Sequence, residues 1–413
     1  MFDFLKKIII TFLGLVILGY LALVIVYLLP TSAIQKNVAE AANIIQMEKS
    51  HPELVYGHQD TMLDNLTDSI MMGTARYETK ENVFLEALLS NRETSNLMMD
   101  SEVIAAEASN VEFDSTVSSY GRYWHGYLLY LKPLLLLLNY GQIRYFIAFF
   151  QMTLFVAVLY LMVKKNKEHH IIPFIVAYLF LNPAALSLSL QYFPVSVITM
   201  IQFILLLAYE ESYKNNNKKW FYHFFIVGCL VAYFDFLTFP LLSLGMPLCF
   251  LIAENRKTLK ENMISFVGSC MAWGFGYAAM WGSKWVLGSL ITKENIIADA
   301  VGNVLLRVGA TESESKVSAL EVILKNIGAN KLCLLITVVI AVGIFVCGIL
   351  KKRRIDLKNV NIVMILCAIL PLMWYLVVSN HSYIHYWFTH RILAISIYAM
   401  LLVVMFLFVK DKN

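Results

Sequence analysis

Charged residues are scarce in this chain, and their scarcity argues against a water-soluble domain. Only 15% of the 413 residues are Asp, Glu, Lys or Arg, whereas 59% are hydrophobic. The mean hydropathy is correspondingly high, at +0.65. This composition is typical of polytopic membrane proteins, in which helices prevail because lipid offers the backbone no hydrogen-bond partner. The sequence therefore predicts an all-α polytopic membrane protein.

Cysteine is also rare, and its placement excludes a disulfide framework. All 6 cysteines lie in apolar segments, outside the polar region 31–125. None accompanies a CxxC pair or a histidine at metal-binding spacing, so we expect no cysteine-based zinc site. The chain also lacks the P-loop, GxGxxG and GxSxG motifs. Nucleotide-driven transport and serine hydrolysis therefore have no support.

Apolar stretches long enough to cross a ~30 Å hydrocarbon layer predict about ten spans. They are 8–29, 145–163, 171–190, 192–209, 220–234, 236–253, 263–283, 332–350, 359–379 and 392–409. We expect one membrane domain over 1–413. Its parts are the first span, an external loop (30–144), spans two to seven (145–283), a second external loop (284–331) and spans eight to ten (332–413).

Lysine and arginine are unevenly distributed between the two sets of alternate loops. One set, which includes both termini, holds 18 Lys and Arg against 8 Asp and Glu. The long polar region on the other side, 31–125, holds 6 against 15. Because cytoplasmic loops carry the basic excess, we expect cytoplasmic termini and an acidic loop outside the plasma membrane. The run 8–29 exceeds the roughly 7–15 residues of a signal-peptide core, so we expect a retained span.

The segment GYLLYLKPLLLLLNYGQIRY (126–145) is apolar enough to be a span, but Lys132 and Pro133 interrupt it. Counting it as a span would place the basic loop KKNKEHH outside. We therefore expect an interfacial helix on the outer leaflet that leads into the second span. Amphipathic patterns in AIQKNVAEAANIIQ and SALEVILKNIG predict further helices. The first loop should accordingly be helical rather than a separate β domain.

Three aspartates recur at four-residue spacing in DTMLDNLTDSIMMG. If the stretch is helical, Asp60, Asp64 and Asp68 share one face, where like charges repel. Crowded carboxylates can share a proton or a divalent cation, and either property suits a base that activates a hydroxyl group. A solvated helix face is the alternative interpretation.

Two shorter motifs fall on the same predicted side. SSYGRYWHGY (118–127) places Arg122 and His125 in an aromatic run, where arginine suits a lipid phosphate and the aromatic rings suit interfacial anchoring. Asp235 in YFDFLTFP is an acid at a hairpin tip. An acid near the membrane usually has a functional partner, although a turn-forming aspartate that caps a helix is the alternative.

The last external hairpin combines histidines with aromatic residues. NHSYIHYWFTHR (380–391) contains His381, His385 and Arg391 among tyrosine and tryptophan. His381 and His385 are four residues apart, but no HExxH motif or third ligand accompanies them, so we expect no metal there. The pattern favours a pocket with a sugar against the rings and a phosphate against Arg391, with an interfacial aromatic belt as the alternative.

The order of one span, a long acidic external loop with interfacial helices and then many spans resembles the GT-C superfamily of integral-membrane glycosyltransferases. The strings DNLTDSIMM, YGRYWHGYLLYLKPLL, FDFLTFPL and HSYIHYWFTHR are similar to those of polytopic proteins associated with bacterial surface polysaccharides. The resemblance implies a GT-C-like fold. It also implies an inverting transfer of a sugar from a polyprenyl-phosphate carrier to an external glycan or glycolipid acceptor.

By the same resemblance, an acid of the first external loop activates the acceptor and a basic residue holds the carrier phosphate. Asp64 or Asp68 would be this base, with Asp60 as a further candidate and a divalent cation as a possible partner of the row. The resemblance also implies that Arg122 or Arg391 meets the carrier phosphate and that Asp235 with His385 positions the sugar or acceptor. With His125 and His381 from the motifs above, these are the expected substrate-binding residues.

Other classes stay open at this point. A polysaccharide polymerase or ligase typically carries its large external loop late in the chain, whereas here it comes first. A transporter would place charged or broken helices at mid-membrane, and the predicted spans hold almost no charge. A non-catalytic partner in cell-envelope glycan export would predict that no single external carboxylate matters.

Overall fold

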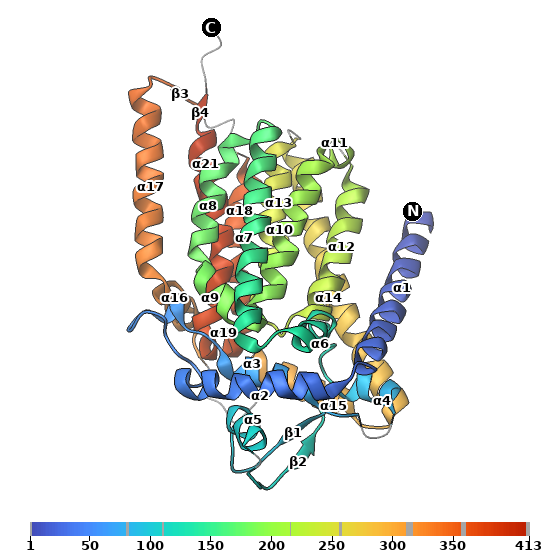
Figure 1. The fold of residues 1–413 in the computed structure, drawn as a ribbon. Helices are drawn as coiled ribbons and strands as arrows, with labels where there is room; N and C mark the ends of the chain where they lie inside the picture. Colours follow the sequence, from blue (N-terminus) through green and yellow to red (C-terminus); the bar gives the residue numbers. More distant parts are fainter. Residues whose placement is uncertain are drawn as a thin grey trace.

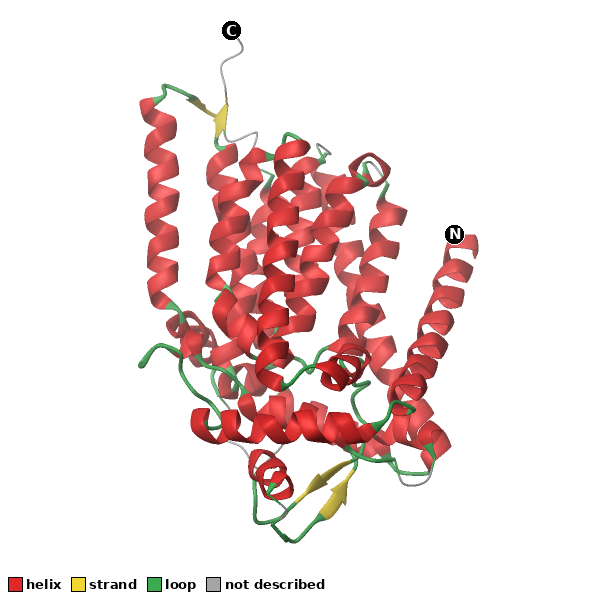
Figure 2. Cartoon of the chain, viewed as in Figure 1, coloured by secondary structure: helices red, strands yellow, loops and turns green. Residues whose placement is uncertain are grey.

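The computed structural model describes residues 2–79, 82–109, 111–214, 216–255, 258–310, 317–356 and 361–409. It is mostly helical (Figure 2). Among the described residues, the strands form two small antiparallel pairs. In these, β1 (Arg92–Thr94) pairs with β2 (Thr116–Ser118), and β3 (Arg354–Ile355) pairs with β4 (Phe408–Val409). The long polar loop after α1 is therefore helical, as predicted, with a small antiparallel strand pair added.

The helices follow one another along the chain with short connections. The α-helices are α1 (Phe2–Tyr27), α2 (Thr31–Glu48), α3 (Asn65–Arg76), α4 (Val83–Leu89), α5 (Asp100–Ala108), α6 (Leu128–Leu137), α7 (Tyr140–Lys164), α8 (Ile171–Phe180), α9 (Pro183–Leu188), α10 (Phe193–Ala208), α11 (Glu210–Tyr213), α12 (Asn217–Phe234), α13 (Leu242–Glu254), α14 (Leu259–Thr292), α15 (Ile296–Arg307), α16 (Ala319–Ala329), α17 (Lys331–Leu350), α18 (Ile362–Val377), α19 (Ser379–Ile384), α20 (Tyr386–Thr389) and α21 (Ala394–Phe406). The 3₁₀ turns are η1 (Gln59–Thr61), η2 (Glu168–His170), η3 (Leu190–Tyr192) and η5 (His390–Leu393).

Six helical segments are long and apolar enough to cross a membrane. They are Phe2–Tyr27, Tyr140–Lys164, Leu190–Ala208, Leu259–Thr292, Lys331–Leu350 and Tyr386–Phe406. The shorter helices α8, α12, α13 and α18 run alongside them (Figure 1). These features agree with an all-α polytopic membrane protein.

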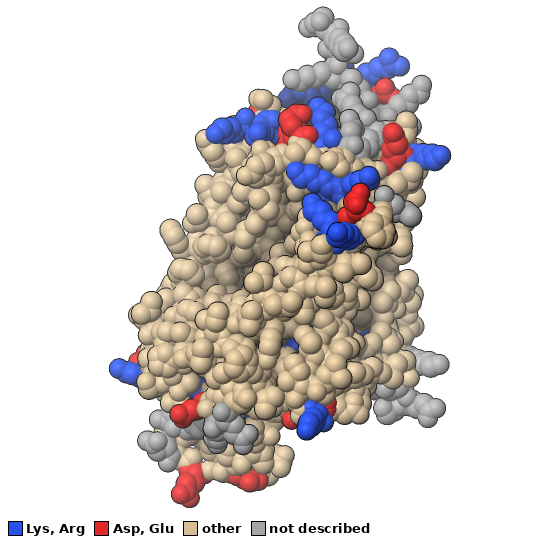
Figure 3. Space-filling view, turned by 90° about the vertical axis from the view of Figure 1, so that its right-hand side faces the viewer, with Lys and Arg blue, Asp and Glu red and all other residues tan. Residues whose placement is uncertain are grey.

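Charged residues gather at the two ends of the helical bundle. Lys and Arg are concentrated at the end where α7, α10, α13 and α17 finish, which we call the basic end (Figures 1 and 3). The opposite end carries α2 to α5, α15, α16 and α19, and we call it the loop end. The face between the two ends is almost free of charge (Figure 3), as expected for a surface in contact with lipid.

Helices α12 and α14 pack closely against each other in the bundle. A Cβ atom added to Gly228 would lie 2.2 Å from the carbonyl oxygen of Trp273, and one added to Gly276 would lie 2.2 Å from that of Phe225. Only glycine at both positions allows the two backbones to approach this closely. The crossing fixes the end of α12, where Asp235 follows.

The segment predicted as one interfacial helix over 126–145 is divided. Helix α6 covers Leu128–Leu137 and lies across the bundle direction near the loop end (Figure 1). Asn139 then starts α7 with a capping box. The Asn139 side chain accepts a hydrogen bond from the Gln142 backbone amide, and the Gln142 side chain accepts one from the Asn139 backbone amide. The cap places the start of the second span at Tyr140, five residues before the predicted start, because it satisfies free amides there.

Candidate functional site

Helix α3 begins inside the aspartate row, and Asp64 is its N-cap. The Asp64 carboxylate accepts a hydrogen bond from the Thr67 amide at 2.9 Å, which satisfies one of the free amides at the helix start. Asp60 lies in the separate turn η1, and the chain leaves that turn in an extended conformation. The predicted single face of three aspartates is therefore wrong for Asp60. Asp64 and Asp68 do lie together, at the start of α3.

Asp64 is buried against the turn between α9 and α10. Its Oδ2 accepts a hydrogen bond from Gln191 Nε2 at 2.5 Å, and its backbone amide donates to Ser189 Oγ at 3.1 Å. On the other side, Nε2 of the partly exposed His51 lies 3.6 Å from Asp64 Oδ1. Burial raises the pKa of the Asp64 carboxyl, although the Thr67 amide, His51 and Gln191 oppose the shift. The Asp64 carboxylate is thus buried, and its Oδ1 faces the partly exposed imidazole of His51.

Asp68 is fully enclosed one turn further along α3. Its Oδ2 accepts from the Tyr140 hydroxyl at 2.6 Å and from the Leu190 amide at 3.0 Å, and its Oδ1 accepts from the Gln191 amide at 3.4 Å. Burial raises the pKa of Asp68 to about 7, against the opposing effects of Tyr140, Leu190 and Arg144. Asp68 therefore holds the α9–α10 turn in place and is close to half-protonated at neutral pH.

Arg144, which the sequence did not single out, supports Asp68 and the first turn of α3. Arg144, in the first turns of α7, forms a two-pronged ion pair with Glu48, with N–O distances of 2.8 and 2.9 Å. The same guanidinium donates to Asn65 Oδ1 at 2.9 Å and to the Tyr140 hydroxyl at 2.7 Å. The side chain of Arg144 is only 6% exposed. A charged residue at a span terminus, four residues after a tyrosine, was the available signal.

Arg391 reaches the aspartate region from the last hairpin. Its Nη2 donates to the carbonyl oxygen of Asp60 at 3.0 Å, its Nε to that of Leu181 at 2.9 Å, and its Nη1 to that of Trp387 at 2.8 Å. The guanidinium also lies over the Tyr192 ring, 4.5 Å from its centre. Arg391 is fully buried. The predicted proximity to the aspartates is present, but its donors are used on main-chain carbonyls, which does not suit a phosphate ligand.

An aromatic path connects Asp64 with a second arginine. The Trp387 ring lies against both His51 and His385, with ring centres 5.4 and 5.1 Å apart. Burial, together with the charges of Arg307 and His51, lowers the pKa of His385 to about 4. His385 is therefore neutral at pH 7. Within the described residues its buried Nδ1 has no hydrogen-bond partner, and neither does Trp387 Nε1.

Arg307 is the least engaged arginine near this path, and the sequence analysis did not select it. It ends α15, is half-buried, and donates from Nη2 to the Tyr123 hydroxyl at 2.6 Å. Its Nε is buried, without a hydrogen-bond partner in the described part of the chain. Nothing in the local sequence distinguishes Arg307, because its neighbours come from residues 123 and 385 in space.

Asp235 caps its own turn at the end of α12. Its carboxylate accepts from the Thr238 amide at 3.0 Å and from the Thr238 hydroxyl at 2.5 Å. This is the turn-forming part of the alternative; the N-cap of α13 is Leu241, so Asp235 does not cap that helix. Asp235 nevertheless faces the site through Tyr130: burial, with the charges of Asp68 and Asp235, raises the pKa of the Tyr130 hydroxyl. That hydroxyl is buried and makes no hydrogen bond to any described residue.

The remaining predicted residues are engaged in structural contacts. Arg122 pairs with Asp299 at 3.1 Å and lies over the Tyr120 ring. His125 is buried and bonded through Nε2 to the Tyr120 carbonyl at 2.8 Å and through Nδ1 to a tyrosine hydroxyl. His381 Nε2 lies 2.8 Å from the Leu237 carbonyl. These contacts account for all three side chains without a ligand.

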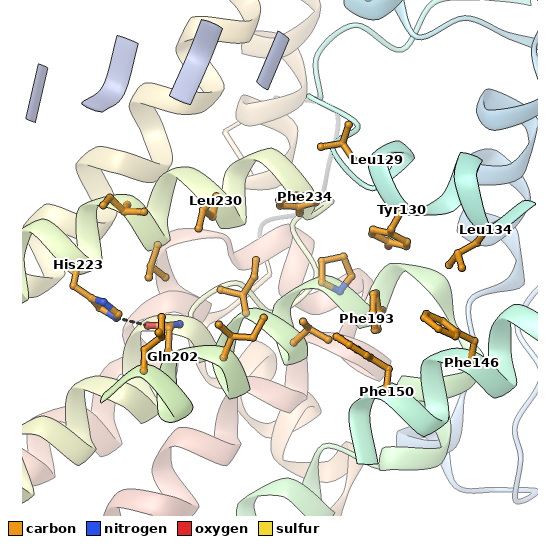
Figure 4. A pocket seen from close by; sticks show the side chains of 17 residues that line it. Leu129, Tyr130, Leu134, Phe146, Phe150, Phe193, Gln202, His223, Leu230 and Phe234 are labelled. Carbon is orange, nitrogen blue, oxygen red and sulfur yellow. Dashed lines mark hydrogen bonds between the residues drawn. The ribbon is translucent and has the colours of Figure 1, made fainter. Parts of the chain in front are cut away.

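An apolar groove of about 670 Å³ lies between α6, α7, α10 and α12 (Figure 4). Its walls are apolar almost throughout, and at one end its polar pair His223 and Gln202 bond to each other at 3.1 Å. Tyr130 from α6 lines the groove near its other end. The lining residues Phe146 and Ile201 are about 40% exposed. The groove thus opens at the apolar side of the bundle and runs to Tyr130, whose pKa the charges of Asp68 and Asp235 help to raise.

The aspartate row does not fit a divalent cation. Asp64 and Asp68 have carboxylate oxygens bonded to protein donors, and Asp60 Oδ2 lies 3.4 Å from Asn182 Nδ2. Over the described ranges, the three carboxylates do not converge as a group of metal ligands. We therefore assign no step of the proposed reaction to the divalent cation considered for this row.

Comparison with protein-family models, curated protein sequences and solved structures gave no match. The geometry of the loop end and the groove therefore carries the functional argument alone.

Proposed function

We propose that this chain is an inverting membrane glycosyltransferase of the GT-C type. It transfers a sugar from a polyprenyl-phosphate carrier to a glycan or glycolipid acceptor at the outer face of the plasma membrane. The observation that carries the proposal is the position of Tyr130. Its ring lines the apolar groove, while its buried hydroxyl makes no hydrogen bond to any described residue and has its pKa raised in part by the charges of Asp68 and Asp235. A lipid chain in the groove would therefore bring its head group to the buried carboxylates.

The groove suits the carrier's hydrocarbon chain. It is apolar, it opens where lipid would surround the bundle, and its volume of about 670 Å³ is in the usual range for small-molecule pockets, which is room for the head-proximal part of the chain. Burial of apolar surface at roughly 25 cal/mol per Å² would supply the binding free energy. No nucleotide site is needed, because a sugar linked to polyprenyl phosphate is already activated.

Asp64 is the residue we assign as base. Its raised pKa and its edge toward His51 suit it to accept the proton of an acceptor hydroxyl. The hydroxyl oxygen then attacks the anomeric carbon from the side opposite the phosphate. The bond between that carbon and the phosphate oxygen breaks, and the polyprenyl phosphate leaves with the electron pair. Asp68 is more enclosed and positions the α9–α10 turn.

Arg307 and His385 are assigned to the carrier phosphate. Arg307 has a buried Nε without a hydrogen-bond partner among the described groups, and the neutral His385 has a free Nδ1. Both can donate to phosphate oxygens, and charge-assisted bonds of this kind are the stronger ones. They replace Arg122, which pairs with Asp299 and lies over the Tyr120 ring, and Arg391, whose donors bond to main-chain carbonyl oxygens.

The membrane threading follows the same proposal. We infer that α8, α12, α13 and α18 cross the bilayer with the six longer segments, for about ten spans. The basic end would then face the cytoplasm with both termini, and the loop end would lie outside.

The test compares Asp64→Asn with Asp114→Asn, an exposed carboxylate of the same loop, in cells that depend on this chain. Asp64→Asn should lower sugar transfer at least about 100-fold, because a general base contributes about that much. The carrier-linked sugar should accumulate while protein levels stay normal. Asp114→Asn should behave as wild type. Unchanged surface glycan in Asp64→Asn would refute the assignment.

A further inference from the structure

Two histidines and a glutamate meet at the basic end, opposite the candidate transferase site. His169 and His170 belong to the turn η2, between α7 and α8, and Glu254 is the last residue of α13 (Figure 1). The basic loop KKNKEHH and the end of α13 are thus joined through side chains. Sequence analysis treated this loop only as a marker of membrane orientation.

The three side chains present their ligand atoms to one point. His169 Nε2 lies 2.7 Å and His170 Nε2 lies 2.8 Å from the same oxygen, Glu254 Oε1. All three ligand atoms lie within 4.8 Å of one another. Zinc bound at about 2.0–2.1 Å to nitrogen and oxygen in a tetrahedron separates its ligand atoms by roughly 3.3 Å. To admit an ion, each imidazole would move about half an ångström away from Glu254, and the two imidazole nitrogens, which lie within 4.8 Å of each other, would close by up to about 1.5 Å.

Surrounding groups orient His170 and Glu254, as hydrogen-bond partners behind metal ligands usually do. The Tyr398 hydroxyl lies 2.6 Å from His170 Nδ1, which leaves Nε2 for the centre of the cluster. Lys167 bonds to the other oxygen of Glu254 and to Glu210 Oε1 at 2.6 Å. With neutral imidazoles, the two carboxylates exceed the single ammonium by one negative charge, which favours a cation.

We propose that His169, His170 and Glu254 bind one divalent transition-metal ion of the zinc class at the basic end. Two imidazoles and one carboxylate suit zinc, cobalt or nickel, whereas calcium and magnesium prefer oxygen ligands throughout. The side chain of His169 is 34% exposed and that of His170 is fully buried. The ion would thus enter from the His169 side and keep a water molecule as its fourth ligand. This site is independent of the proposed transferase activity.

The alternative is an ion-pair network that needs no metal, in which both imidazoles donate to Glu254. The two differ in what removal of His169 does. If the three residues form only an ion-pair network, removal of His169 costs one surface hydrogen bond. If they bind a metal ion, removal of His169 takes away one of its ligands.

The experiment uses the full-length protein in detergent, with the purification tag removed and metal extracted by a chelator. Titration with Co²⁺ and Zn²⁺ should show one ion per chain, with the strong visible absorption of tetrahedral cobalt. His169→Ala should abolish stoichiometric binding, and Tyr398→Phe should weaken it about 10–100-fold. His58→Ala, an exposed histidine of the loop end, is the matched control and should bind as wild type. Absence of stoichiometric binding by wild type, or unchanged binding by His169→Ala, would overturn the proposal.

Discussion

The guanidinium of Arg391 donates a hydrogen bond to the carbonyl oxygen of Asp60 across 331 residues of sequence, at an N–O distance of 3.0 Å. The bond joins the last membrane hairpin to the acid-rich loop that follows the first span. It places both segments at one end of the bundle, which the proposed site requires. It also assigns Arg391 to holding the backbone.

Arg391→Lys tests that structural role. Lysine cannot reach all three carbonyl oxygens, so buried acceptors lose partners at about 1–3 kcal/mol each. We expect a clear fall in Tm of the purified protein together with a loss of transfer. Arg307→Lys should lower transfer with little change in Tm. Wild-type stability with lost activity in Arg391→Lys would instead assign Arg391 to the substrate.

Asp68 should make stability depend on pH. Its folded-state pKa is about 7, against a usual value of 3.8, so the folded protein holds the proton more tightly than the unfolded chain does. The free energy of unfolding then falls as pH rises from about 4 to about 7, by up to about 4 kcal/mol. Asp68→Asn removes this dependence and should gain in Tm relative to wild type between pH 5 and pH 8. A Tm difference that is constant with pH would contradict the burial of an ionisable Asp68.

Filling the groove should block the lipid chain. Val197 lines the groove, and Val197→Trp would occupy much of the space that a chain needs. We expect at least a tenfold loss of transfer and a matching loss of co-purified polyprenyl lipid, measured by native mass spectrometry. Val339→Trp on the exposed face of α17 should leave both unchanged. Equal lipid content in the two variants would count against the groove.

A substitution that forces α12 away from α14 should impair the site, although the crossing lies outside it. Gly276→Ala places a Cβ atom 2.2 Å from the Phe225 carbonyl oxygen, an overpacking that costs typically about 1–3 kcal/mol. We expect a lower Tm and reduced transfer, because Asp235 and Tyr130 depend on the end of α12. Gly274→Ala meets no atom within 4 Å and serves as the control on the same helix. Equal Tm values for the two variants would show that the crossing is loosely packed.

Much of the fold could be predicted from the sequence, because a segment that crosses lipid must be long, apolar and helical. Long apolar runs predicted the six long helices, and the amphipathic patterns predicted α2 and α16. The parity of the spans predicted that Asp64 and the hairpin around His385 lie at one end. The structure places them together through Trp387.

Side-chain roles were harder to predict, because their partners are remote or are main-chain atoms. Arg391 bonds to carbonyl oxygens, which every sequence possesses. Arg144 and Arg307 have partners 96 and 184 residues away. Asp60 was grouped with Asp64 by spacing alone. Helix α3 begins directly after its N-cap, Asp64, so Asp60 lies outside the helix.

The most direct test of the proposed function is photolabelling of the purified protein with a polyprenyl phosphate that carries a diazirine near its phosphate. The account predicts crosslinks on α6 and beside His385 and Arg307, which are assigned to the phosphate, and their loss when unlabelled polyprenyl phosphate competes. Crosslinks spread over outer helices such as α17, or crosslinks that competition leaves unchanged, would contradict a carrier site at the buried aspartates.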